Sequence, residues 1–265
     1  MPQTSFTPEP VPREETLEAV VSNPSFAKDA LALIHGIAET KEQNEVLELF
    51  HTSRAALGAD QAFFVSFVRD DESRESIRFL LAASARWCLE YEQMAWFGND
   101  AWLMHAITDP NPICDSAISY RTNVQRNIRE LARKFGVESA YIVPAPTSGG
   151  VSRIGALILT SQRAGFFECP TSRHLKPIAR ALSMELHEWW TRRIREDIIV
   201  DHRIDDTDLE LLRLEKRGLK TKQIAAETQT SEASVNSRFQ RLNAKFGQHN
   251  RKASARFATE YGLIS

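Results

Sequence analysis

The clearest hydrophobic pattern in this 265-residue chain lies near its C-terminus. Val235, Phe239, Leu242 and Phe246 recur at helical intervals, which places all four on one stripe of an α-helix. Residues 221–228 show helical spacing of their own, and the polar residues 229–231 separate the two segments. We therefore predict two helices joined by a tight turn, within a set of four short helices over residues 204–265.

Apolar runs in the first 200 residues predict a sheet between helices. We expect helices at about 26–38 and 41–57, strands at 62–68 and 76–83, a hairpin of strands 139–145 and 153–161, and a helix from about 171 to 196. Helices on both faces of an antiparallel sheet form an α/β/α sandwich. The expected fold class is α+β, with this sandwich followed by an all-α, four-helix helix-turn-helix domain.

These patterns divide the chain into four segments. Residues 1–16 contain four prolines and are expected to form a flexible lead. Residues 17–195 form the sandwich domain, residues 196–203 a linker, and residues 204–265 the helix-turn-helix domain. The long helix before the linker and a last helix carrying Phe257 and Tyr261 are candidates for contacts between two copies of the chain.

Composition excludes several classes of protein. No apolar stretch approaches the length of a membrane span, and the N-terminus lacks the apolar core of a signal peptide, so we expect a cytoplasmic protein without a membrane partner. Cys88, Cys114 and Cys169 have no paired spacing and are expected to be reduced thiols. No glycine-rich phosphate loop or metal-ligand spacing stands out, so we predict no metal site and no nucleotide cofactor.

Basic residues are concentrated in the C-terminal segment. Residues 204–265 hold 11 basic and 8 acidic side chains, although the whole chain has a formal net charge of −2. Six of those cations fall between Ser234 and Arg256, where there is no Asp or Glu. Such a local excess is typical of a surface that neutralises phosphates. The second helix of the predicted pair is therefore expected to present its polar side to double-stranded DNA.

The C-terminal segment resembles the DNA-binding domain of LuxR-type transcriptional regulators. That family opens the domain with an acidic residue, a Leu four residues later and a Gly six after that, and here Asp208, Leu212 and Gly218 have this spacing. It continues with Ile-Ala, a Ser that begins the recognition helix, a Ser/Thr-Val pair and a terminal Gly-Leu-Ile, all of which this chain has. The matching residues are Ile224-Ala225, Ser231, Ser234-Val235 and Gly262-Leu263-Ile264. Where the family commonly has His in the recognition helix, this chain has Arg238.

Residues on the polar side of the two helices are the candidates for DNA contacts. Side chains at the start of the first helix would bind phosphates and fix the register, and those of the second would reach base edges or further phosphates. Ser231 would also cap the second helix. The candidates are Lys220, Thr221, Lys222, Ser231, Ser234, Asn236, Ser237, Arg238, Arg241 and Lys245.

The sandwich domain resembles the signal-binding domain of the same family, less closely. The family pattern is a Trp, a Tyr four residues later and an Asp-Pro pair nine residues after the Tyr. Trp96 and Asp109-Pro110 are thirteen residues apart, as that pattern requires, with Asp100 at the Tyr position. Val124 then falls where a second aromatic is usual, and Ile158 where the last strand usually has Ser or Thr.

The resemblance implies a small-molecule signal as the ligand of the sandwich domain. In the family the Asp accepts from the amide of an acyl-homoserine lactone and the Trp donates to the lactone carbonyl. The candidate ligand residues are Trp96, Asp100, Asp109, Tyr141 and Ile158. Because three of five polar positions differ, we expect an altered pocket and an orphan regulator that works without a signal or with a different one.

Three alternatives remain open at this level. The first is a regulator that responds to an acyl-homoserine lactone as other family members do. The second is an anti-activator that pairs with a related regulator and blocks it. The third, an enzyme built around Asp100, His105 and Asp109, lacks an evident nucleophile or oxyanion donor, so we predict no catalytic residue. The main expectation is a homodimer on a near-palindromic promoter site, because one helix-turn-helix covers only a half-site.

Overall fold

The computed structural model describes residues 15–68, 77–93, 97–146 and 153–264. The described residues divide into two compact units, one of residues 15–146 and 154–189 and the other of residues 190–264 together with Arg153. We call these the N-terminal unit and the C-terminal unit and describe each by itself.

The centre of the N-terminal unit is a five-stranded sheet with the order β2-β1-β5-β4-β3. Antiparallel pairing joins β1 to β2, β5 to β4 and β4 to β3. The Asp60 N–H donates to the Thr160 carbonyl at 2.8 Å, which places the start of β1 beside the end of β5 and makes this pair antiparallel as well. The strands are β1 (Gln61–Val68), β2 (Arg78–Ala82), β3 (Ile113–Cys114), β4 (Ser139–Ala145) and β5 (Arg153–Ser161).

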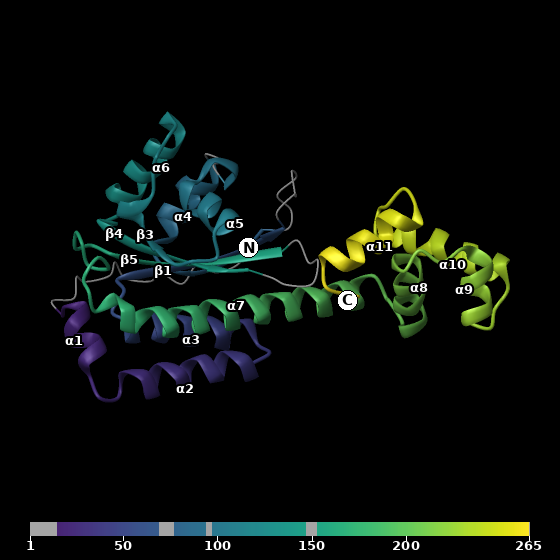
Figure 1. Ribbon diagram of the computed structural model, residues 1–265, viewed down its shortest axis with the longest axis horizontal. Coiled ribbons are helices and arrows are strands. Elements are labelled where there is room, and N and C mark those ends of the chain that lie inside the picture. The colour runs from purple at the N-terminus through teal and green to yellow at the C-terminus, as the bar shows by residue number, and fades with distance from the viewer. Residues whose placement is uncertain (1–14, 69–76, 94–96, 147–152, 265) are drawn as a thin grey trace. The chain divides into compact units, whose positions relative to one another are not determined.

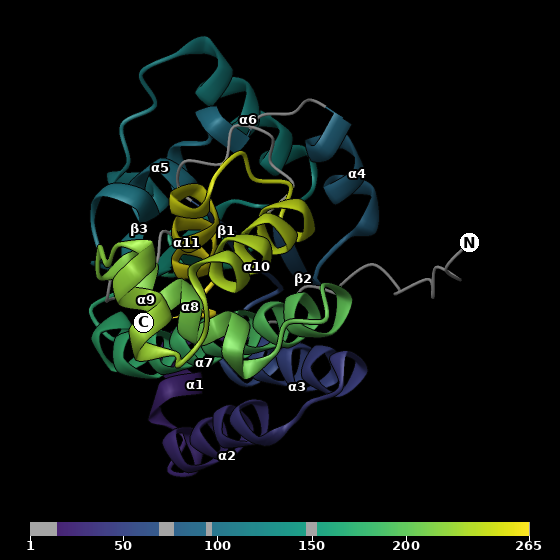
Figure 2. The same ribbon diagram turned by 90° about the vertical axis from the view of Figure 1, so that its right-hand side faces the viewer.

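Helices cover both faces of this sheet, as Figures 1 and 2 show. On one face lie α1 (Leu17–Ser22), α2 (Phe26–Glu39), α3 (Gln43–Ala56) and α7 (Ser172–Asp201). On the other lie α4 (Ala85–Gln93), α5 (Ala101–Thr108) and α6 (Asn123–Lys134), with the short 3-10 helices Phe97–Asn99 and Asp115–Ala117 in the connections. The α/β/α arrangement expected from the sequence is confirmed.

The sequence reading missed the layer formed by α4, α5 and α6. A local signal for α6 was present, because Thr122 and Gln125 form a capping box at its N-terminus. The predicted end of the last long helix also differs, since α7 continues to Asp201. Most of the expected linker, residues 196–203, is therefore helical.

Alternation along the strands sends side chains to two apolar layers. Ala156 and Ile158 of β5 join Phe63 and Val65 of β1 in the core beneath α4, α5 and α6. On the opposite face the Ser183 hydroxyl of α7 donates to the Val143 carbonyl at 2.8 Å. Both faces of β4 and β5 are buried, which explains why these strands read as continuous apolar runs.

Gly155 of β5 lies where the sheet and α7 approach each other closely. A Cβ atom at this position would come within 2.9 Å of both His187 Nδ1 and Phe64 Cζ. We expect Gly155→Ala to lower the free energy of unfolding by about 1–3 kcal/mol, because two packed rings would have to shift. Chemical denaturation would measure it. Gly36→Ala is the control, since the new methyl would meet only the movable end of Leu49, at 3.3 Å, and a comparable loss there would contradict this explanation.

The C-terminal unit contains four short helices around one apolar core. They are α8 (Asp206–Lys216), α9 (Thr221–Glu227), α10 (Glu232–Lys245) and α11 (Arg251–Glu260). Leu212, Ile224 and Val235 are buried together, and the predicted stripe of α10 faces this core. Gly218 has a φ of +81° and ends α8 in the left-handed conformation that favours glycine. The four helices and the turn expected from the sequence are confirmed.

Candidate ligand cavity and nucleic-acid surface

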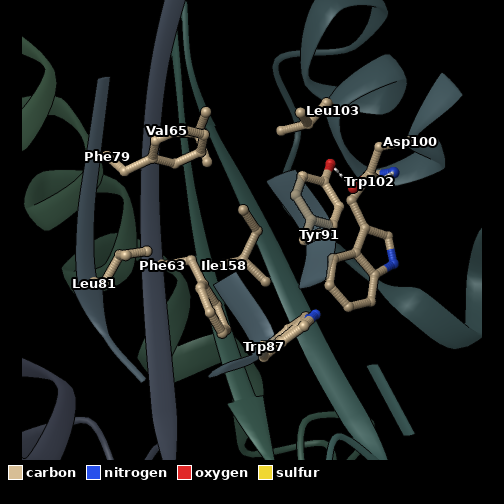
Figure 3. Close-up of a pocket in the computed structure, with 10 residues that line it drawn as sticks. All are labelled: Phe63, Val65, Phe79, Leu81, Trp87, Tyr91, Asp100, Trp102, Leu103 and Ile158. Carbon is tan, nitrogen blue, oxygen red and sulfur yellow. Dashed lines mark hydrogen bonds between the residues drawn. The ribbon is translucent and has the colours of Figure 1, made fainter. Parts of the chain in front are cut away.

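The N-terminal unit contains a small, mostly apolar cavity between the sheet and the α4–α5 layer (Figure 3). Its volume is about 60 Å³. Strands β1, β2 and β5 form the apolar wall, while α4 and the start of α5 bring in the polar groups. The lining residues are Phe63, Val65, Phe79, Leu81, Trp87, Tyr91, Asp100, Trp102, Leu103 and Ile158.

Asp100 is a buried carboxylate at the polar end of this cavity. As the N-cap of α5 it accepts from the Trp102 N–H at 2.8 Å, and its other oxygen accepts from the Tyr91 hydroxyl at 2.6 Å (Figure 3). Burial raises the pKa of Asp100, and these hydrogen bonds only partly offset that effect. No cation is paired with the carboxylate among the described residues. The site therefore holds a strong hydrogen-bond acceptor at the cost of an unfavourable environment for its charge.

Trp87 contributes an indole N–H to the same cavity. The ring packs edge-to-face on Phe63, with 4.1 Å between the ring centroids. Its Nε1 is buried and has no hydrogen-bond partner among the described residues. A buried donor without a partner is rare and costly in folded proteins. This donor lies in the cavity lining that also contains the Asp100 acceptor, so the cavity is equipped to bind a molecule with both a carbonyl and an N–H.

Trp102 differs from Trp87 although both line the cavity. Its indole N–H donates to the Tyr120 hydroxyl at 2.9 Å and is therefore satisfied within the protein. The Tyr120 phenol is neutral at physiological pH, and burial raises its pKa further, to about 12. Of the two indoles, only that of Trp87 is left to bond a ligand.

The structure brings together two of the five ligand residues predicted from the sequence. Asp100 and Ile158 both line the cavity, whereas Trp96 lies outside the described residues. Asp109 is not in the lining: it caps the C-terminus of α5, and its carboxylate accepts from the backbone and side-chain amides of Asn111, which lower its pKa. Tyr141 is also absent from the lining, because its ring stacks on Phe167, 5.9 Å away, while its neighbours Ala140 and Ile142 belong to the core on the cavity side.

The family's Trp-Tyr-Asp spacing occurs with all three residue types nine residues earlier in the chain. Trp87, Tyr91 and Asp100 are four and nine residues apart, and all three line the cavity. Sequence reasoning chose Trp96 and Asp109 because Pro110 completes the usual Asp-Pro pair, whereas Ala101 follows Asp100. Asp100 therefore also falls at the Asp position of this spacing, in addition to the Tyr position that the sequence analysis gave it.

The exposed side of α10 is the candidate nucleic-acid surface of the C-terminal unit. Ser231 caps the helix, with its hydroxyl accepting from the Ser234 N–H at 3.1 Å, and Gln229 takes a left-handed φ of 54° in the turn before it. Val235 and Phe239 hold the opposite side of α10 in the core. On α10 and at its N-cap, the exposed members of the predicted set are Ser231, Ser234, Asn236, Ser237 and Arg241.

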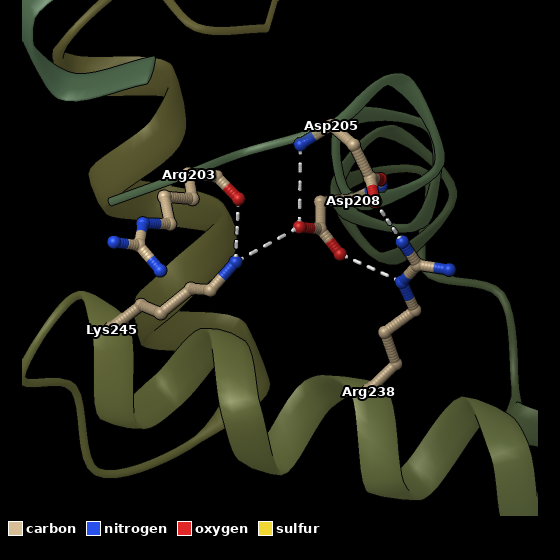
Figure 4. A network of polar contacts seen from close by, with 5 residues as sticks. All are labelled: Arg203, Asp205, Asp208, Arg238 and Lys245. Atoms are coloured by element: carbon tan, nitrogen blue, oxygen red, sulfur yellow. Dashed lines mark hydrogen bonds and ion pairs between the residues drawn. The ribbon is translucent and has the colours of Figure 1, made fainter. Parts of the chain in front are cut away.

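Two predicted DNA-contacting cations are instead engaged within the protein (Figure 4). Arg238 Nε lies 2.8 Å from Asp208 Oδ1, and its Nη2 pairs with Asp205. Lys245 Nζ lies 3.3 Å from Asp208 Oδ2 and donates to the Arg203 carbonyl at 2.8 Å. The carboxylate of Asp208 is only 5% exposed, so these contacts tie α10 to the start of α8. We call these five residues the α8–α10 clamp.

Of the three predicted phosphate-contacting residues at the start of α9, two have exposed side chains and one is bonded within the protein. Lys220 and Lys222 are exposed, whereas the Thr221 hydroxyl accepts from Arg251 Nη1 at 2.9 Å. Arg251 in turn pairs with the buried carboxylate of Glu215 at 3.0 Å. Arg251 therefore links the start of α9 to α11, while the exposed side chains of Lys220 and Lys222 remain available to bind an anion.

The described part of the chain offers neither a membrane span nor a metal site. None of its helices is long and apolar enough to cross a membrane. It also holds no group of three or more His, Cys, Asp or Glu side chains placed to bind a metal ion. His105 bonds to the Asn111 carbonyl at 2.7 Å rather than to Asp100.

Comparisons with known proteins give one family match and several structural ones. The autoinducer binding domain family matches residues 42–188. The crystal structure of Escherichia coli SdiA superposes with a TM-score of 0.69 at 17% identity, covering 91% of this chain and 99% of that one. SdiA in complex with octanoyl-rac-glycerol gives 0.68 at 18% identity, covering 92% and 98%.

A third structure is similar over part of the chain. The N-acylhomoserine lactone dependent LuxR family transcription factor CepR2 from Burkholderia cenocepacia has a TM-score of 0.51 at 15% identity, covering 63% of this chain and 98% of that one. At such identities these likenesses show a shared fold. A comparison with curated protein sequences found no significant match.

Proposed function

This chain belongs to the autoinducer binding domain family, and from that premise we propose that it is a LuxR-type quorum-sensing regulator of transcription in bacteria. Its N-terminal unit binds a small signal and its C-terminal unit binds promoter DNA. The observation that carries the proposal is the cavity in which the unpartnered Trp87 N–H and the buried Asp100 carboxylate occur together.

The chemistry of the cavity fits an acylated signal with an amide head group. Asp100 would accept from the amide N–H and Trp87 would donate to the lactone carbonyl, as the family resemblance implies for Asp and Trp at this spacing. The apolar wall of Val65, Phe79 and Ile158 would surround the acyl chain. Because Trp87, Tyr91 and Asp100 are all present, we propose a signal-responsive regulator in place of the altered, signal-independent pocket expected from the sequence.

The volume of the cavity limits how the signal enters. Sites for drug-sized ligands usually have about 300–1,000 Å³, and this cavity has about 60 Å³. An acyl chain therefore requires lining side chains to move outward. Octanoyl-rac-glycerol, which SdiA binds in a solved complex, has an acyl chain but no amide, so it belongs in the ligand panel beside acyl-homoserine lactones.

The test of the signal site compares two tryptophans. Trp87→Phe removes the unpartnered donor, and we expect the Kd of the best lactone in the panel to rise about 2- to 10-fold, the effect of one neutral hydrogen bond. Trp102→Phe makes the same chemical change in the same cavity but removes a donor that Tyr120 already satisfies. Isothermal titration on the full chain would measure both. Equal effects, or no binding by any member of the panel, would count against the site.

DNA binding is proposed for the exposed side of α10. Ser234, Ser237 and Arg241 recur along it at helical spacing, so they can face one groove together. Because one such helix covers a half-site, we propose a homodimer on a near-palindromic site, acting in the cytoplasm. Selection from a genomic fragment pool, with and without the signal, tests this: enrichment of a discrete, two-fold symmetric site supports it, and no enrichment refutes it.

A second candidate is an anti-activator that pairs with a related regulator. One observation favours it: the α8–α10 clamp engages Arg238 and Lys245, which leaves Arg241 as the one cation of α10 without an ion pair among the described residues. Such a chain would bind no DNA alone but would lower the affinity of the partner regulator for its site. Mixing experiments with a related regulator separate it from the first proposal.

A further inference from the structure

A second positively charged surface of the C-terminal unit lies apart from the exposed side of α10. The end of α8, the turn at residues 218–220 and α11 from Arg251 to Thr259 border an open recess of about 590 Å³. Cations from all three segments line it. They are Lys216, Lys220, Arg251, Lys252 and Arg256. We call this the basic recess.

The acids near the basic recess offset only part of this charge. Glu215 is the one acidic residue in the lining, and it is paired with Arg251 at 3.0 Å. Arg256 forms an exposed pair with Glu260 within α11, a kind of contact that contributes little. Lys216, Lys220 and Lys252 are exposed and form no ion pair among the described residues. Their mutual repulsion is a cost of folding that a bound polyanion would relieve.

The basic recess continues to the start of α9. Lys220 both lines the recess and belongs to the predicted phosphate-binding set, and the next residue, Thr221, bonds to Arg251 of the recess. A small anion would occupy only part of a surface formed by two helices and a turn. Duplex DNA instead presents a continuous row of phosphates, one charge for about every 1.7 Å of its axis. A linear polyanion is therefore the ligand that suits this distribution of charge.

We propose that the basic recess binds the sugar-phosphate backbone of DNA beyond the base pairs contacted by α10. This inference rests on the proposed DNA-binding function and extends it to Lys216, Lys252 and Arg256, which the sequence pattern did not assign. Contacts with phosphate carry no sequence information directly. The recess thus adds affinity for DNA of any sequence, while α10 provides the selection.

The salt dependence of DNA binding tests the proposal on the full chain. Replacing Lys216, Lys252 and Arg256 with Gln together should lower the slope of log Kd against log salt by about 2–3, since each phosphate contact contributes about 0.9. The loss of affinity should be equal on the selected site and on unrelated DNA. A control triple variant, Lys28→Gln, Arg133→Gln and Lys134→Gln, removes the same charge from exposed positions of the N-terminal unit and should leave the slope unchanged.

Each outcome separates this inference from the proposed function. Wild-type protein that binds no DNA refutes both. If the wild type binds and the recess variant keeps its slope, the recess does not bind the backbone and the proposed function stands. A loss confined to the selected site would show base reading and would also overturn the assignment. Circular dichroism melting of each variant shows whether a loss of DNA affinity is caused by unfolding. If the triple variant is unfolded, the single variant Lys252→Gln tests the proposal instead, and it should lower the slope by about 0.9.

Discussion

Asp100→Asn is expected to stabilise the N-terminal unit at neutral pH and to weaken binding of the signal. The Asn side chain keeps an oxygen for the Trp102 N–H, and its amide can donate to the Tyr91 hydroxyl, which is free to rotate. The signal, however, loses a charged acceptor, and hydrogen bonds to charged groups contribute about 1.5–3 kcal/mol. We expect the Kd of the signal to rise roughly 10- to 150-fold by that range.

The stability effect should depend on pH in a defined direction. Burial raises the pKa of Asp100 in the folded protein, so the protonated form stabilises the fold. That contribution is complete below the ordinary pKa, near 4, and is lost as the pH rises through the raised folded value. The wild type should lose stability across this window, whereas the Asn variant should not. Urea denaturation at a series of pH values, without signal, would measure the difference.

Asp109→Asn is the matched control for this experiment. Hydrogen bonds from Asn111 lower the pKa of Asp109, so its contribution to stability has the opposite sign and is lost as the pH falls. Because Asp109 is not in the cavity lining, its substitution should leave signal binding unchanged. The opposite result, weaker binding with Asp109→Asn and unchanged binding with Asp100→Asn, would contradict this assignment. It would favour the motif position predicted from the sequence, with Trp96 and Asp109 as the ligand residues.

Asp208→Ala is expected to have the largest effect on the C-terminal unit. It removes the carboxylate that bonds both Arg238 and Lys245 and breaks the capping box at the start of α8. Removing one member of a buried ion pair costs about 3–5 kcal/mol. Arg238 and Lys245 keep 27% and 31% exposure and can be hydrated, so we expect a smaller loss, about 2–4 kcal/mol. Guanidinium denaturation would measure the loss.

A double-mutant cycle shows whether the clamp causes that loss. Arg238→Ala alone and Asp208→Ala alone should each destabilise the unit, and the double variant should lose less than their sum. Asp206→Ala, in the same turn of α8 but exposed, is the control and should lose no more than about 1 kcal/mol, the size of a helix-dipole contribution. Additive losses from Asp208 and Arg238 would show that the two side chains do not act as a pair.

Local patterns predicted the C-terminal unit well because its determinants are close in sequence. The spacing of Val235, Phe239 and Leu242, the Ser231 cap and the glycine after α8 each act within a few residues, and all have the expected structural role. The role of Arg238 could not be found in this way. Its partner Asp208 is thirty residues earlier, and only the packing of α10 on α8 brings the two side chains together.

The cavity could not be predicted from the sequence because its lining is spread over several segments of the chain. Its lining comes from β1, β2, α4, α5 and β5, so no single segment reveals it. The Trp-Tyr-Asp spacing was visible at Trp87, Tyr91 and Asp100, but the Asp109-Pro110 pair favoured the later placement. What distinguishes the two is burial: Asp100 lies inside the core, and the Asp109 carboxylate bonds to Asn111 at the end of its helix. Burial of this kind depends on the sheet that α5 covers.

Lys245 also acts on the backbone where the chain enters the four helices. Arg203 has a φ of 48°, a left-handed conformation that costs a residue with a side chain about 1–2 kcal/mol, and Lys245 bonds to its carbonyl while pairing with Asp208. One ammonium group therefore offsets a strained peptide and a buried carboxylate at the same time. A DNA phosphate that attracted this ammonium would weaken both contacts at once.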